Sequence, residues 1–170
     1  MDVIAETRRL CIRRIGPDDA GAMFDVYGDA EAMRFVGDGR ALTPEQCQQW
    51  VGVSLRNYEV RGYGMFAVTD RATGQVLGFA GLVHPGGHET PELKYALRRE
   101  AWGQGLATEA ARALLRYAFD RGIREVIATV SPENGPSMAV LLKAGMTTGG
   151  LRVDDDGSYT QVFVWRATAR

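Results

Sequence analysis

The spacing of apolar residues predicts alternating strands and helices along almost the whole chain. Period-two alternation and short β-branched runs are typical of strands, whereas apolar residues three and four positions apart are typical of helices. We therefore expect strands at residues 8–15, 65–69, 75–83, 92–98, 124–130, 147–153 and 158–166. We expect helices at residues 17–28, 44–60, 105–121 and 135–143. The resulting order, β-α-α-β-β-β-α-β-α-β-β, favours an α/β (α+β) domain built on one mixed sheet.

Local signals mark several boundaries of these elements. Thr43, Pro44 and Gln46 form a capping box with proline at the first helical position. Asp156-Gly157 predicts a tight hairpin turn between the last two strands. The helix at 105–121 should lie close to a sheet because small and apolar residues share one of its faces. These residues are Ala107, Ala110, Ala111, Leu114 and Ala118.

Length and composition indicate one ordinary globular domain. The chain has 170 residues, of which 45% are hydrophobic and 24% charged. We expect a single domain at residues 8–167, preceded by a short N-terminal extension at residues 1–7.

A net charge of −1 supplies no general attraction for phosphate backbones, which argues against a nucleic-acid partner. No apolar run reaches membrane-spanning length and the N-terminus has no secretory pattern, so we expect a cytoplasmic protein without membrane contact. Cys11 and Cys47 are expected to be free thiols.

The most informative segment joins the strand at 92–98 to the helix that begins near Gly105. Glycines at 103 and 105 permit positive φ and close approach of a ligand to the backbone, while unpaired N–H groups at the helix start favour an anion. A dinucleotide fingerprint fits poorly, because Thr108 occupies its third small position and the segment comes late in the chain. A P-loop fits poorly because its lysine is absent. Taken alone, these two glycines could also form a tight turn that binds no ligand.

The run from Trp102 to Ala110, Trp-Gly-Gln-Gly-Leu-Ala-Thr-Glu-Ala, resembles the acetyl-CoA-binding motif of the GNAT superfamily. Trp102, Gly105 and Ala107 align with the Gln/Arg-x-x-Gly-x-Gly/Ala pattern, with tryptophan in place of the usual Gln or Arg. A second segment, Asn134-x-x-Ser137 leading to Lys143-Ala-Gly-Met, is similar to another motif of the family. Within the superfamily, the Trp-Gly-x-Gly-x-Ala-Thr-Glu-Ala form of the first segment looks most like the Rim-type ribosomal-protein N-terminal acetyltransferases.

This resemblance implies a sheet that splays between the fourth and fifth strands, with acetyl-CoA bound in the gap. It also implies backbone and side-chain contacts to the pyrophosphate and pantetheine of acetyl-CoA. The implied contact residues are Ala96, Leu97, Arg98, Trp102, Gly103, Gln104, Gly105, Leu106, Ala107, Thr108, Asn134 and Ser137.

Two residues are candidates for proton transfer. Glu92 aligns with an acidic residue common in the Rim-type branch and could accept a proton from the incoming amine; the alternative is a strand-end carboxylate in solvent. Leu141 occupies the position where many relatives carry a tyrosine that protonates the CoA thiolate. Ser137 is the nearest substitute, and the alternative is that it only caps the helix or contacts CoA.

Other suggestive residues have simpler interpretations. His84 and His88 lie in a loop rich in proline and glycine. No cysteine is nearby and only Glu89 is adjacent, so we expect no metal site. Asp154, Asp155 and Asp156 are typical of a solvated turn, although a carboxylate cluster beside the acceptor site could attract a cationic amine.

The leading hypothesis is a cytoplasmic N-acetyltransferase that acts by direct transfer in a ternary complex. The acceptor would be a protein N-terminus or a small amine, and a homodimer is common among relatives. Two alternatives remain: a catalytically weak acyl-CoA-binding regulatory module, and a dinucleotide-binding redox protein.

Overall fold

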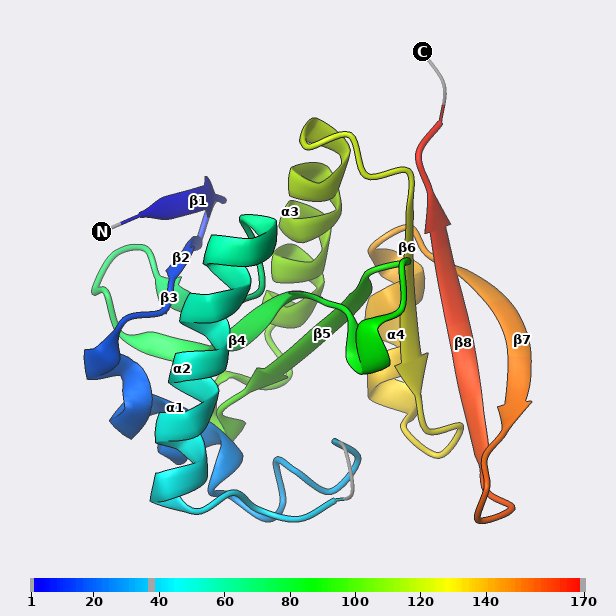
Figure 1. The fold of residues 1–170 in the computed structure, drawn as a ribbon, viewed down its shortest axis with the longest axis horizontal. Coiled ribbons are helices and arrows are strands. Elements are labelled where there is room, and N and C mark those ends of the chain that lie inside the picture. Colours follow the sequence, from blue (N-terminus) through cyan, green and yellow to red (C-terminus); the bar gives the residue numbers. More distant parts are fainter. Residues whose placement is uncertain (1, 37–38, 169–170) are drawn as a thin grey trace.

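The structure is a computed structural model that describes residues 2–36 and 39–168. Within these residues the strands form one eight-stranded sheet in the order β1-β2-β3-β4-β5-β6-β8-β7 (Figure 1). The strands are β1 (Val3–Glu6), β2 (Leu10–Arg14), β3 (Met65–Asp70), β4 (Val76–Val83), β5 (Glu92–Leu97), β6 (Glu125–Val130), β7 (Thr147–Val153) and β8 (Tyr159–Arg166). The helices are α1 (Ala20–Tyr27), α2 (Pro44–Arg61), α3 (Leu106–Asp120) and α4 (Gly135–Lys143), with short 3-10 turns η1 (Pro17–Asp19), η2 (Pro85–Gly87) and η3 (Arg99–Ala101).

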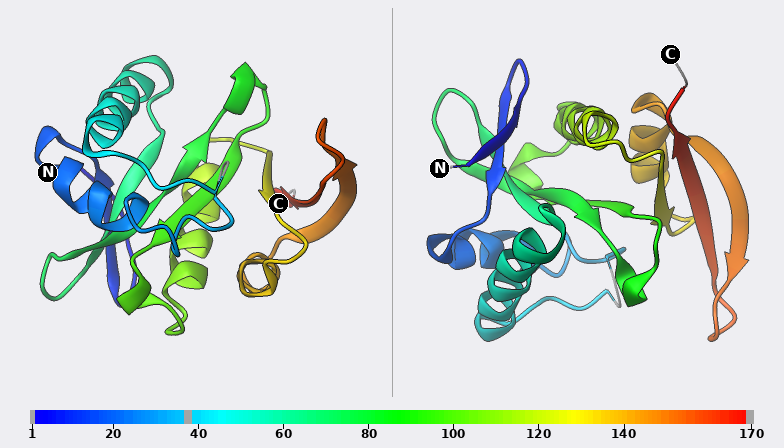
Figure 2. Two further views of the ribbon diagram at one scale, coloured as in Figure 1. Left: turned by 90° about the horizontal axis from the view of Figure 1, so that it is seen from below. Right: turned by 45° about the horizontal axis from the view of Figure 1, so that its top comes forward.

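The helices cover both faces of the sheet. Helices α1 and α2 lie on one face, and α3 and α4 lie on the other (Figures 1 and 2). Phe79 and Ala96 belong to the buried cluster that includes residues of α1 and α2. Leu82 and Leu97 belong to the cluster that includes the apolar face of α3, where Leu114 is fully buried. The predicted helix face is confirmed, and its small residues let α3 pack closely on the strands.

The sheet changes character between β5 and β6. β4 pairs with β5 along the whole length of β5, from Gly78 opposite Leu97 to Val83 opposite Glu92. β5 and β6 are parallel instead, and their register contains one pair, Glu92 with Ile127. Beyond that pair the two strands diverge (Figure 1). The expected splay is therefore confirmed, and it leaves one edge of β5 without a neighbouring strand.

The predicted order of elements is confirmed with one addition. Residues Val3–Glu6, expected to be part of an N-terminal extension, form strand β1 and pair antiparallel with β2. The four-residue strand is too short for its alternation to stand out from the sequence. The predicted helix at 17–28 divides into η1 and α1.

The capping box of α2 is confirmed. Thr43 Oγ1 accepts from Gln46 N at 3.2 Å, and Gln46 Oε1 accepts from Thr43 N at 2.9 Å. No helix in the described part of the chain is long and apolar enough to span a bilayer.

Candidate active site

The glycine loop connects the C-terminal end of β5 to the start of α3. Gly103 and Gly105 adopt φ values of 73° and 77°, which side chains other than glycine rarely tolerate. A Cβ at Gly103 would meet no atom within 4 Å, so a ligand can approach the backbone there. Glu109 N is bonded to Gly105 O at 3.1 Å, which leaves the N–H groups of residues 106–108 as the unpaired donors of the first helical turn. Together with the helix dipole, these donors suit an anionic pyrophosphate.

Trp102 holds this loop against β5. Its indole Nε1 donates to the carbonyl oxygen of Leu97 at 2.8 Å. This bond explains how tryptophan can stand where relatives carry Gln or Arg. The side chain fixes the loop to the strand and leaves anion binding to the backbone. Gln104 Nε2 adds a second internal bond, donating to Glu100 O at 2.9 Å.

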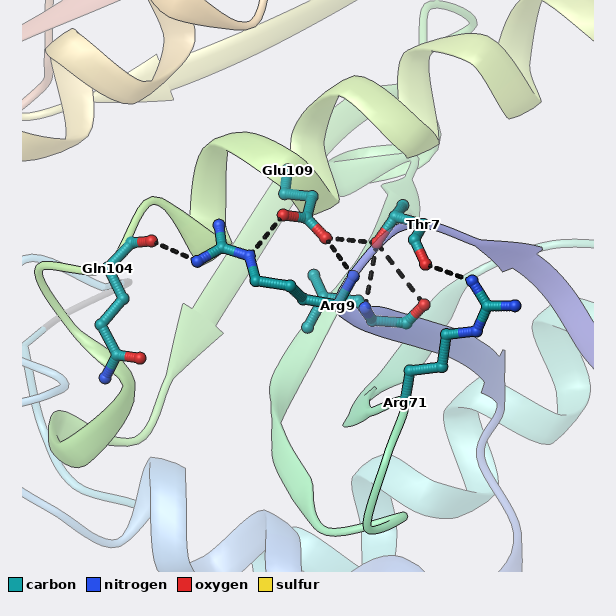
Figure 3. A network of polar contacts seen from close by, with 6 residues as sticks. Thr7, Arg9, Arg71, Gln104 and Glu109 are labelled. Atoms are coloured by element: carbon teal, nitrogen blue, oxygen red, sulfur yellow. Dashed lines mark hydrogen bonds and ion pairs between the residues drawn. The ribbon is translucent and has the colours of Figure 1, made fainter.

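Arg9 and Glu109 join the loop to the N-terminal strands (Figure 3). Arg9 donates from NH1 to the Gln104 carbonyl at 2.8 Å and from Nε to Glu109 Oε1 at 2.8 Å. Glu109 also accepts from the hydroxyl of Thr7 and from the backbone N–H of Arg9. Burial alone would raise the pKa of Glu109, but these donors outweigh it and the pKa lies below its usual value. Sequence reasoning missed this network because its members lie about 100 positions apart.

The free edge of β5 carries the backbone groups of only one of the three residues we expected there, Ala96, Leu97 and Arg98. Arg98 N donates to Leu77 O at 2.8 Å, so this amide is committed to β4. Because strand residues alternate in the direction of their backbone groups, Ala96 also faces β4. Tyr95 and Leu97 face the splay. Leu97 is one of the three residues expected there, whereas the N–H group of Tyr95 takes the place expected for those of Ala96 and Arg98. The correction follows from the register of β4, which the sequence does not reveal.

Glu92 occupies the point where β5 leaves β6. The residue is 7% exposed, so the interpretation as a solvated strand-end carboxylate is wrong. Its Oε1 accepts a hydrogen bond from the hydroxyl of Thr129 on β6. Glu92 and Ala96 lie four positions apart on β5 and therefore share the sheet face covered by α1 and α2.

Ser137 lies across the splay from β5, in the first turn of α4. The helix is capped by Asn134, whose Oδ1 accepts from Ser137 N at 3.2 Å, so the interpretation of Ser137 as the cap is wrong. The Ser137 Oγ lies 2.5 Å from the phenolic oxygen of Tyr95. Tyr95 was absent from the predicted site, because only the fold brings it to a residue 42 positions later.

The remaining candidates do not join this site. Leu141, at the position of the tyrosine of many relatives, is 2% exposed and part of the core. His84 is bonded through Nδ1 to His88 O and through Nε2 to the Tyr63 hydroxyl, each at 2.7 Å. The described residues contain no cluster of three or more potential metal ligands.

The aspartates of the last hairpin are mostly engaged within it. Asp154 accepts bonds from Arg152 and Thr160, and Asp156 accepts from Ser158. These bonds lower the pKa of both carboxyl groups, so the two aspartates are ionised at neutral pH. The hydrogen bonds of these aspartates stabilise the hairpin turn. That the carboxylates also attract a cationic acceptor amine stays a prediction.

Comparison with known proteins agrees with this geometry. The family described as "Acetyltransferase (GNAT) domain" matches residues 9–147. The chain belongs to the GNAT acetyltransferases. As a GNAT enzyme it depends on acetyl-CoA. It is 29% identical to the "Uncharacterized N-acetyltransferase YnaD" of Bacillus subtilis over 145 residues, covering 85% of this chain and 82% of that protein.

Solved structures show the same GNAT fold. An acetyltransferase of the GNAT family from Bacillus anthracis superimposes with a TM-score of 0.83 at 24% identity, covering 98% of each chain. RimL, described as a ribosomal L7/L12 α-N-protein acetyltransferase in complex with CoA, superimposes with a TM-score of 0.82 at 17% identity. The alignment with RimL covers 97% of this chain and 98% of that structure.

Proposed function

We propose that this GNAT enzyme transfers the acetyl group of acetyl-CoA directly to a primary amine, with both substrates bound together. The observation that carries the proposal is the arrangement of β5. One end of this strand leads into the glycine loop, and the other end holds the buried carboxylate of Glu92. A single strand thus links an anion-binding loop to a candidate base.

The residues of the chain fit acetyl-CoA along this strand. The loop at Gly103–Gly105 and the first turn of α3 would bind the pyrophosphate. The N–H groups of Tyr95 and Leu97 would bind the pantetheine and the thioester oxygen, and such backbone donors typically stabilise a developing negative charge by about 3 kcal/mol each. The expected contact from Asn134 remains part of the proposal, although its Oδ1 is already engaged in capping α4.

Glu92 is proposed to accept a proton from the acceptor ammonium, since only the neutral amine is nucleophilic. Acetyl-CoA supplies the activated acyl carbon. In the net reaction the carbon–sulfur bond breaks and a carbon–nitrogen bond forms. The amine loses two protons, one passing through Glu92 to solvent, and the sulfur gains one. Ser137 is proposed to assist the departing sulfur.

Either a protein N-terminus or a small molecule can supply the acceptor amine in this proposal. The name of RimL describes an enzyme that acetylates a protein N-terminus. Because the two proteins share a fold, protein N-termini are the first class of acceptor to test here. A catalytically weak acyl-CoA-binding module is the second candidate. Burial of Leu141 at the position of the usual catalytic tyrosine favours it. The cytoplasmic location and a homodimer stay predictions.

The decisive experiment measures thiol release from acetyl-CoA with a panel of N-terminal peptides, polyamines and amino acids. We expect Glu92→Gln to lower kcat by about a hundredfold, within the range typical of a lost general base. The difference in kcat between wild type and Glu92→Gln should shrink as the pH approaches the pKa of the acceptor amine, because solvent then deprotonates the amine.

Glu125→Gln is the matched control, because Glu125 lies on neighbouring β6, is half-buried and pairs with Arg166. Calorimetry should show unchanged acetyl-CoA binding in both variants. Wild-type protein that binds acetyl-CoA but acetylates no amine would favour the binding module. A Glu92→Gln deficit that is constant with pH would remove Glu92 from the role of base.

A further inference from the structure

The phenol of Tyr95 and the hydroxyl of Ser137 connect the two sides of the splay. Tyr95 projects from β5 and Ser137 from α4, and their oxygens are 2.5 Å apart, at the short end for two hydroxyl groups. Strand alternation places Tyr95 on the sheet face opposite to Glu92. The pair therefore lies on the α3–α4 side of the strand, whereas the candidate base lies on the α1–α2 side.

Each hydroxyl can donate in this bond, and the chemistry indicates the direction. A phenol is a stronger acid than an aliphatic alcohol, so it is the better donor in a short bond. The phenolic oxygen also lies 3.5 Å from the carbonyl oxygen of Ser137, an atom that can only accept. Both contacts orient the phenolic hydrogen toward Ser137, which leaves the serine hydrogen free to point elsewhere.

We propose that Tyr95 is a positioning residue that donates to Ser137 Oγ and directs the serine O–H toward the sulfur of bound CoA. Two bonds then fix Ser137: its backbone N–H donates to Asn134 Oδ1, and its Oγ accepts from Tyr95. The serine O–H would donate a hydrogen bond to the sulfur as negative charge develops there. The catalytic role of the Tyr95–Ser137 pair rests on the proposed acetyl transfer.

The electrostatic setting of Tyr95 agrees with a donor that keeps its proton. Burial raises the pKa of Tyr95, and the bond with Ser137 only partly offsets this rise. The phenol thus stays neutral at physiological pH and acts through its hydrogen bond. The Tyr95–Ser137 pair thus places a hydroxyl group in the splay, even though Leu141 occupies the position where many relatives carry a tyrosine.

The test uses CoA itself as the probe and follows thiolate absorbance in the ultraviolet as a function of pH. We expect the bound thiol to ionise at lower pH than free CoA. Tyr95→Phe and Ser137→Ala should each lower the bound thiolate fraction at a fixed pH by about tenfold, the order expected for one lost hydrogen bond to a charge. The double variant should fall no further than Ser137→Ala alone, because Tyr95 acts through the serine.

Tyr117→Phe is the matched control. Tyr117 packs against the same core, and among the described residues its hydroxyl makes only a 3.5 Å contact with Gly62 O. It should leave the thiolate fraction unchanged within about twofold. The inference is overturned if Tyr95→Phe behaves like wild type, or if the double variant loses the product of the two single effects.

Acetyl transfer measured on the same samples separates this inference from the proposed function. Wild type that shows the thiolate effect but acetylates no amine would refute the proposed function and leave the Tyr95–Ser137 pairing standing. Normal transfer without the thiolate effect would refute the pairing alone. Protein that does not bind CoA would refute both.

Discussion

Asp19 illustrates how a charge is kept inside this protein. Its carboxylate accepts from Arg13 NH1 at 2.8 Å and NH2 at 2.9 Å, and from Gly16 N at 2.7 Å. Both charged side chains are about one-tenth exposed, at 11% and 9% for Arg13 and Asp19. Burial alone would raise the pKa of Asp19, but the donors outweigh it and the pKa lies below its usual value. The bidentate pair fixes the connection from β2 to α1.

We predict that Asp19→Asn lowers the free energy of unfolding by about 3 kcal/mol at pH 7, because it leaves Arg13 buried without a counter-ion. The folded-state pKa of Asp19 is depressed, so its stabilisation is present above the unfolded pKa of about 3.9 and is lost as the pH falls through the folded value. Denaturant unfolding at several pH values should therefore show the difference between wild type and variant shrinking below about pH 4. Asp18→Asn, at an exposed neighbouring position, should change stability by less than about 0.5 kcal/mol.

At the scale of elements, the start of α3 depends on a side chain from another part of the chain. Arg9 bonds to the loop carbonyl of Gln104 and is itself fixed by Glu109 in the first turns of the helix. A cation so placed can hold the loop in shape and also attract the phosphates of acetyl-CoA. These two contributions can be separated.

We predict that Arg9→Met raises the KM for acetyl-CoA by about tenfold with little change in kcat, because a charge-assisted hydrogen bond to the loop is lost. Glu109→Gln keeps the positive charge of Arg9 but removes the carboxylate that pairs with it. This variant should therefore raise the KM for acetyl-CoA by a smaller factor. Arg116→Met, which alters an exposed ion pair with Asp120 on the same helix, is the control. An unchanged KM for Glu109→Gln would show that Arg9 acts through its charge alone.

The contrast between Gly105 and Tyr95 shows how much the sequence could predict. Gly105 is predictable because glycine spacing, a helix start and a family motif coincide within a few residues, and such local signals need no knowledge of the fold. Glu92 was likewise a candidate, but its burial and its partner Thr129 depend on where β6 lies. The pair of Tyr95 and Ser137 depends on packing between β5 and α4, which leaves no local pattern. Strand β1 was missed for a related reason, since pairing with β2 defines it more than its own residues do.

At the scale of the whole molecule, the sheet consists of two parts that meet between β5 and β6. The first part, β1 to β5, is antiparallel throughout. The second contains β6, β8 and β7, again antiparallel. Between them the register contains the single pair of Glu92 and Ile127, so side-chain packing across the junction must supply most of the cohesion.

We predict that CoA slows amide hydrogen exchange most in β5 and β6 and least in β2 and β3. The reason is that pantetheine would bond to the free edge of β5 and contact the facing elements, replacing backbone pairs that the splay lacks. Mass spectrometry of peptides with and without CoA measures this pattern. Gly105→Val, which strains the loop at φ 77°, should abolish the effect at the same CoA concentration. Equal slowing in every strand would contradict the prediction.

If acetyl-CoA binds across the junction between β5 and β6, the lifetime of the protein would depend on the supply of acetyl-CoA. A ligand that binds only the folded chain adds stability by mass action, about 2.7 kcal/mol at a hundred times its Kd. Because acetyl-CoA would connect the two parts of the sheet, starvation for it would leave the β6–β8 part open to unfolding and proteolysis. The amount of enzyme in a cell would then follow the concentration of the metabolite that it consumes.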